Sequence, residues 1–178
     1  MNEKKNLTII EDIIILYKSG KLDEAKSKIE NCIKKFPKPF VLHNVLGAIF
    51  SDQGKLEEAV KQHKKAIEIN PSYAEGYNNL GIAFQKLKQF NEAVTNYKKA
   101  LKLKPDFAAG YNNLAGALKN LSKLEEALIN CKKAIELKPD FADAHNNLGS
   151  VLKDLNHLEQ SKECFEKAIE LKPDYVEA

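Results

Sequence analysis

Apolar and small residues recur along the chain in a pattern that repeats every 34 residues. Within residues 74–107, the side chains at i, i+3, i+4 and i+7 are Tyr77, Leu80, Gly81 and Phe84. This spacing places them on one face of an amphipathic helix. A second run follows, with Ala93, Tyr97 and Ala100. Each 34-residue copy is therefore predicted to be a helix, a short turn and a second helix.

Proline punctuates the copies at a constant interval. The five positions are Pro37, Pro71, Pro105, Pro139 and Pro173. Proline lacks an amide hydrogen and cannot continue a helix, so each one is expected to end a copy. After Pro71, the pair Ser72 and Glu75 predicts a capping box for the next helix. Self-similarity at this period indicates a stacked repeat architecture, in which each unit buries its apolar face against its neighbours.

The residue order in each copy resembles the tetratricopeptide repeat (TPR) family. The shared pattern is large, Leu, Gly and aromatic on the first helix, Ala, aromatic and Ala on the second, and then Pro. The resemblance covers nearly the whole chain and implies an all-α fold, a right-handed α-solenoid of stacked 34-residue helix-turn-helix units. We expect a single array over residues 1–178, with regular repeats at 39–72, 73–106, 107–140 and 141–174. Residues 175–178 are expected to start a further helix or to form a tail.

The first copy, residues 7–38, departs from the pattern. Its first helix fits only when shifted by one residue, because the unshifted frame would bury Asp12 at a core leucine position, which is costly. The shifted frame buries Ile10, Ile13, Ile14 and Tyr17. Terminal repeats are commonly atypical, so we interpret this copy as an N-terminal capping repeat.

Composition narrows the class of protein. With 43% hydrophobic and 30% charged residues, the chain fits a helical protein in water. It contains no apolar run long enough to span a membrane and no secretory signal, so no membrane partner and a cytoplasmic location are expected. A net charge of +3 is too small to indicate a nucleic-acid partner, although a ridge of lysines on second helices is a weaker alternative. The three cysteines are expected to be reduced thiols that pack as small apolar groups.

Catalytic and metal-binding patterns are missing from the sequence. It has no Gly-rich phosphate loop, no His/Cys cluster with metal-ligand spacing and no nucleophile elbow. His43, His63 and His145 occupy core positions of the helical stripes, and His157 is expected to be exposed in a turn. We therefore predict no enzyme activity in this chain, no cofactor and no metal.

Repeated asparagine pairs are the strongest candidates for function. In TPR arrays the first helices line a concave groove, and the two positions before the stripe leucine face it. Here those positions hold Asn78 and Asn79, Asn112 and Asn113, and Asn146 and Asn147. Asparagine is a poor helix former, so its recurrence calls for a reason. Its amide matches the donors and acceptors of an extended peptide backbone. The alternative is that these amides bond to neighbouring repeats and only order the stack.

Further polar residues are expected to flank the groove. They are Glu75, Gln85, Lys119, Asp143 and Lys153. The asparagine pattern resembles the ladder in the TPR superhelix of O-linked N-acetylglucosamine transferases, although Val45 interrupts it one repeat earlier. The two-carboxylate clamp of chaperone-binding TPR proteins is excluded, because its basic positions correspond to Asn44, Ala109 and Asn113.

The resemblance implies a non-catalytic scaffold that binds a protein or an extended peptide in its concave groove. The alternative is the N-terminal substrate-recognition part of a larger glycosyltransferase- or sulfotransferase-like enzyme. Self-association through the last repeat is a further alternative, since an uncapped repeat leaves an apolar face.

Overall fold

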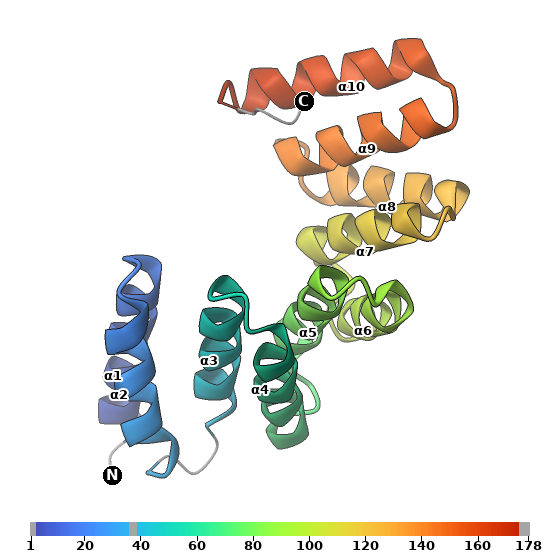
Figure 1. The fold of residues 1–178 in the computed structure, drawn as a ribbon. Coiled ribbons are helices and arrows are strands. Elements are labelled where there is room, and N and C mark those ends of the chain that lie inside the picture. Colours follow the sequence, from blue (N-terminus) through green and yellow to red (C-terminus); the bar gives the residue numbers. More distant parts are fainter. Residues whose placement is uncertain (1–2, 36–38, 175–178) are drawn as a thin grey trace. The chain divides into compact units, whose positions relative to one another are not determined.

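The computed structural model describes residues 3–35 and 39–174, and these fold into ten α-helices without a β-strand (Figure 1). They group into two compact units, Met1–Leu87 and Lys88–Ala178. The division falls between the two helices of the predicted repeat 73–106. The all-α repeat fold is confirmed, whereas a single continuous array stays a prediction. Pro37 and residues 175–178 lie outside the described residues.

The first unit holds five helices. They are α1 (Glu3–Lys18), α2 (Leu22–Ile33), α3 (Phe40–Asp52), α4 (Leu56–Ile69) and α5 (Ala74–Lys86). Each helix packs on the next one along the chain, and the first helices of successive repeats also touch, α1 against α3 and α3 against α5. Three first helices therefore lie in sequence on one side of this unit.

The second unit holds the other five helices. They are α6 (Phe90–Leu103), α7 (Ala108–Asn120), α8 (Leu124–Leu137), α9 (Ala142–Asp154) and α10 (Leu158–Leu171). Consecutive helices again pack together, and the first helices α7 and α9 contact each other. The helix pairs α7–α8 and α9–α10 fall within the predicted repeats 107–140 and 141–174.

The degenerate first repeat shares a core with α3. Ile13 is fully buried with Ile29 and Leu42, while Ile10, Ile14 and Tyr17 are partly buried against this cluster. The shifted frame predicted for α1 is therefore confirmed. Asp12 is exposed, so its charge is not buried, and it pairs with Lys28 at 3.0 Å.

A left-handed residue ends the first helix of every repeat. Positive φ angles occur at Gly20, Gly54, Lys88, Ser122 and Asn156, which are 34 residues apart. Glycine adopts this conformation without steric cost, whereas a lysine or a serine is strained there. The sequence pattern did not reveal this requirement, because glycine occupies only two of the five positions.

The capping box predicted at Ser72 and Glu75 is wrong. α5 begins at Ala74 with Tyr73 at the N-cap, and its side chain makes no capping hydrogen bond. The amide of Ser72 instead bonds to Oδ1 of Asn70 at 3.2 Å, so the turn after α4 satisfies its own donor. None of the described helices is long and apolar enough to cross a membrane.

Candidate functional site

The first helices of unit 1 line an open cavity of about 390 Å³. α1, α3 and α5 supply most of its lining, which consists of Ile14, Tyr17, Lys18, Val41, Asn44, Val45, Ala48, Ser51, Asp52, His63, Tyr73, Asn79, Ile82 and Lys86. The volume lies within the range of pockets that bind small ligands or side chains. Of the residues predicted for the site, only Asn79 lines this cavity.

The middle of the cavity is apolar. Val41, Val45 and Ala48 stand at i, i+4 and i+7 on α3, so they share one helix face. Ile14 from α1 and Ile82 from α5 complete this surface. Val45 occupies the repeat position that Asn79 holds in the next repeat, so the interruption of the asparagine series creates an apolar patch.

A hydrogen-bonded cluster closes one side of the cavity. Oδ1 of Asn44 accepts hydrogen bonds from Nδ1 of His63 at 2.9 Å and from Nδ2 of Asn79 at 3.1 Å. Nδ2 of Asn44 donates to the Tyr73 hydroxyl at 3.1 Å. The Tyr73 ring packs edge-on against Phe40, with 5.1 Å between ring centroids. Asn44 therefore bonds to three side chains of the scaffold and fixes their orientation.

His63 is a neutral structural residue of this cluster. Its side chain is buried, and burial lowers its pKa from 6.5 to about 4. The ring lies so close to Gly47 that a Cβ at that position would approach it to 2.6 Å. Glycine on the first helix is thus required by the histidine on the second. His43 is also buried, as predicted for a core position, and its Nδ1 lies 2.8 Å from Oε1 of Gln62.

Charged and hydroxyl groups line the opposite end of the cavity. The Tyr17 hydroxyl donates to Oδ2 of Asp52 at 2.8 Å, and Nζ of Lys86 donates to Oγ of Ser51 at 2.9 Å. Burial, followed by the bond to Asp52 and its charge, raises the pKa of Tyr17 to about 12, so its hydroxyl stays protonated. Lys18 is exposed at the same end. These groups come from the C-terminal ends of α1, α3 and α5.

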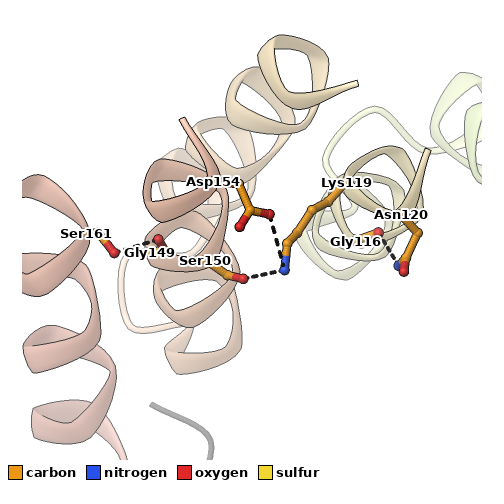
Figure 2. A network of polar contacts seen from close by, with 7 residues as sticks. All are labelled: Gly116, Lys119, Asn120, Gly149, Ser150, Asp154 and Ser161. Atoms are coloured by element: carbon orange, nitrogen blue, oxygen red, sulfur yellow. Dashed lines mark hydrogen bonds and ion pairs between the residues drawn. The ribbon is translucent and has the colours of Figure 1, made fainter. Parts of the chain in front are cut away.

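In α9 of unit 2, the polar residues Asn147 and Ser150 stand at the repeat positions of Val45 and Ala48. Nδ2 of Asn147 donates to Oδ1 of Asn112 at 2.8 Å, which links α9 to α7. Figure 2 shows Lys119 reaching from α7 to the Ser150 hydroxyl, with Oδ2 of Asp154 at 3.7 Å. Ser150 stands at the repeat position of Ala48. The same view shows the Ser161 hydroxyl bonded to the Gly149 carbonyl at 2.7 Å, which joins α10 to α9.

The predicted site residues differ in how far solvent reaches them. Asn78 and Asn112 are buried. The half-buried ones are Asn79, Asn113, Asn146, Asn147, Glu75, Gln85 and Lys119. Asp143 and Lys153 are exposed. Two pairs, Asn44 with Asn79 and Asn112 with Asn147, bond across repeats, so part of the series orders the stack; contact with a peptide stays a prediction.

Asn146 differs from its equivalents in the earlier repeats. Its Oδ1 is buried, and no donor among the described residues reaches it. Oδ1 of Asn44 and of Asn112, at the same repeat position, each accept a bond from the following repeat. His145 is only half-buried, and its Nε2 donates to the Pro139 carbonyl at 2.9 Å.

The cysteines are free thiols on second helices. Cys131 is buried, which raises its pKa to about 12 and keeps it protonated, as expected for a packing residue. Cys32 and Cys164 are partly buried. Within residues 3–35 and 39–174, no three His, Cys, Asp or Glu side chains are grouped so as to hold a metal ion.

The repeat pattern identified in the sequence is matched by four family models. Models described as TPR repeat or tetratricopeptide repeat match residues 47–88 and 117–156, 74–107, 96–129, and 142–175. Together they extend from residue 47 to residue 175, which is more than half of the chain. The chain belongs to the tetratricopeptide repeat family. Among curated proteins, none matches this TPR chain significantly in sequence.

Solved structures share the TPR fold at low sequence identity. MamA is 22% identical and has a TM-score of 0.76, with 92% of this chain and 95% of MamA covered. PilF of Pseudomonas aeruginosa is 16% identical with a TM-score of 0.86, over 94% of this chain and 77% of that chain. YrrB, a TPR protein with an unusual peptide-binding site, is 22% identical with a TM-score of 0.72, over 95% and 87%. Identities this low establish the fold alone.

Proposed function

We propose that this TPR chain is a non-catalytic module that binds an extended segment of a partner protein, with a side chain of that segment inside the unit 1 cavity. The observation that carries the proposal is the apolar surface of Val41, Val45 and Ala48 in the cavity. In α9 of unit 2, the repeat positions of Val45 and Ala48 hold the polar residues Asn147 and Ser150. Binding sites typically combine such an apolar lining with a few placed polar groups.

The apolar lining would supply most of the affinity. An aliphatic or aromatic side chain that leaves water for this surface gains roughly 25 cal/mol per Å² of buried apolar area. Ala48 leaves room for it, since its methyl group is the smallest side chain on this face. YrrB, which shares the fold, is described as having a peptide-binding site, and this supports the class of ligand.

Asn79 would hold the main chain of the bound segment. One hydrogen of its amide is used by Asn44, and the half-buried side chain lines the cavity. Oδ1 of Asn79 accepts a long bond of 3.5 Å from Nδ2 of Asn78, which leaves its second lone pair. The second amide hydrogen and this lone pair suit the carbonyl and amide of an extended peptide. The buried bond to Asn44 fixes the rotamer of Asn79, which reduces the conformational entropy lost on binding.

The experiment is selection from a library of random heptapeptides, acetylated and amidated at their ends, with wild-type protein and with Ala48→Phe. The phenyl ring is expected to fill the cavity and abolish enrichment. Ser150→Phe places the same ring at the equivalent position of α9 and is expected to retain the selected peptides. Thermal unfolding followed by circular dichroism verifies that both variants fold. No enrichment by wild type, or equal enrichment by Ala48→Phe, would refute the proposal.

A further inference from the structure

We infer that the segment bound in the unit 1 cavity carries an acidic side chain one or two residues from its apolar anchor, held by Lys18 and Lys86. The inference rests on the proposed function and specifies the chemistry of its ligand. Both lysines line the cavity. They stand two repeats apart at the same repeat position, and Asp52 holds that position in the repeat between them.

Neither lysine is neutralised by another side chain within residues 3–35 and 39–174. Among the residues that the structure describes, neither Lys18 nor Lys86 makes an ion pair, and Lys86 bonds only to the uncharged Ser51 hydroxyl. Asp52 already accepts the 2.8 Å hydrogen bond of Tyr17. With His63 neutral, the cavity lining carries one net positive charge, from two lysines and one aspartate. A single carboxylate balances it.

The apolar surface and the two cations are one helical turn apart. Lys86 follows Ile82 by four residues on α5, and Ser51, which bonds Lys86, follows Ala48 by three residues on α3. Side chains at these spacings lie about 5–6 Å apart on a helix surface. An extended peptide advances roughly 3.3 Å per residue. A carboxylate one or two residues from the buried anchor therefore reaches the lysines.

The arrangement fits an acidic side chain better than the carboxyl terminus of a peptide. Lysine ammonium groups are flexible point charges that attract a carboxylate without fixing its plane. Capture of a terminal carboxylate usually relies on converging backbone N–H groups. α1, α3 and α5 all end at this side of the cavity, and helix C-termini present carbonyl groups rather than N–H groups.

The test uses the strongest heptapeptide from the library selection and its Glu→Gln or Asp→Asn analogue, with binding followed by fluorescence anisotropy. Selected peptides should contain Asp or Glu one or two positions from an aliphatic or aromatic residue. The amide analogue should bind wild type about fivefold more weakly, as expected for a partly exposed ion pair. The double variant K18Q/K86Q should reduce this difference to less than about twofold. Lys61→Gln, an exposed lysine on α4 outside the cavity, should preserve it.

Four results would overturn the inference. Selected peptides without an acidic residue, or equal binding of the acid and amide forms, would show that the lysines do not bind a carboxylate of the peptide. If Ala48→Phe still lost these peptides, the proposed function would remain supported. Tighter binding of a peptide whose only carboxylate is its free C-terminus would show that the lysines hold the end of the peptide chain rather than an acidic side chain. A wild-type protein that selects no peptide would reject the inference together with the proposed function.

Discussion

Nδ2 of Asn147 lies 2.8 Å from Oδ1 of Asn112, one repeat earlier in the chain, and the bond joins the first helices α9 and α7. Asn79 and Asn44 repeat this relationship in unit 1 at 3.1 Å. In both pairs the acceptor is buried and the donor is half-buried. The two consecutive asparagines of a repeat thus have different roles. The first accepts a hydrogen bond from the next repeat, and the second can reach the groove.

This difference predicts unequal costs for alanine substitutions at the acceptor position. Asn112→Ala removes the acceptor of Asn147 and leaves a half-buried amide without its partner, which should lower the free energy of unfolding by about 1–2 kcal/mol. Asn146→Ala removes a buried Oδ1 that accepts no hydrogen bond, so its cost should stay below about 0.5 kcal/mol. Urea unfolding followed by circular dichroism measures both. Equal losses would show that the bond between repeats contributes nothing specific.

The left-handed turn residues predict a stabilising substitution. Ser122 has φ +57° and an exposed side chain, so Ser122→Gly should remove steric strain and raise the free energy of unfolding by about 0.5–1 kcal/mol. Gly54→Ser makes the opposite change at the equivalent turn, where φ is +74°, and should destabilise by a similar amount. A lower melting temperature for Ser122→Gly would contradict this account of the turn.

The helix pairs of the four regular repeats could be predicted from the sequence, because the 34-residue period, the apolar stripe and the proline agree in each of them. The shifted α1 frame followed from one physical argument, the cost of burying Asp12. The turn conformation could not be predicted in the same way, since Lys88, Ser122 and Asn156 do not share a chemical type. The Ser72 cap failed because α5 begins at Ala74, one residue later than a cap at Ser72 requires.

The buried His63 predicts a pH dependence of stability. Its folded pKa of about 4 lies below the unfolded value of 6.5, so the unfolded chain takes up the proton first as the pH falls. The contribution of His63 is complete above pH 6.5 and is lost between pH 6.5 and 4, by about 2 kcal/mol at pH 5.

His63→Phe supplies the control, because it keeps a ring and cannot titrate. The loss of unfolding free energy between pH 7 and pH 5 should be larger in wild type than in this variant, and the difference isolates His63 from the carboxylates. Parallel pH profiles for the two proteins would mean that the histidine is protonated as easily in the fold as in the unfolded chain.

The cavity was missed because it depends on neighbours that are far apart in sequence. Val45 was recognised as an interruption of the asparagine series, but its consequence appears only when Ile14 and Ile82 close around it. The contacts of Lys86 with Ser51, and of Tyr17 with Asp52, each join residues 35 positions apart. Comparing the same repeat position in adjacent first helices would have revealed the apolar and charged groups that meet there.

The measurement that tests the central claim most directly is a titration of ¹⁵N-labelled protein with the strongest selected heptapeptide, followed by amide chemical shifts. If the cavity is the binding site, saturable shifts should appear at Val45, Ala48 and Ile82 and fade along α2 and α4. The same titration of Ala48→Phe should leave these amides unmoved. Shifts confined to α4, around Lys61 and Lys64, or to the helices of unit 2 would contradict the account.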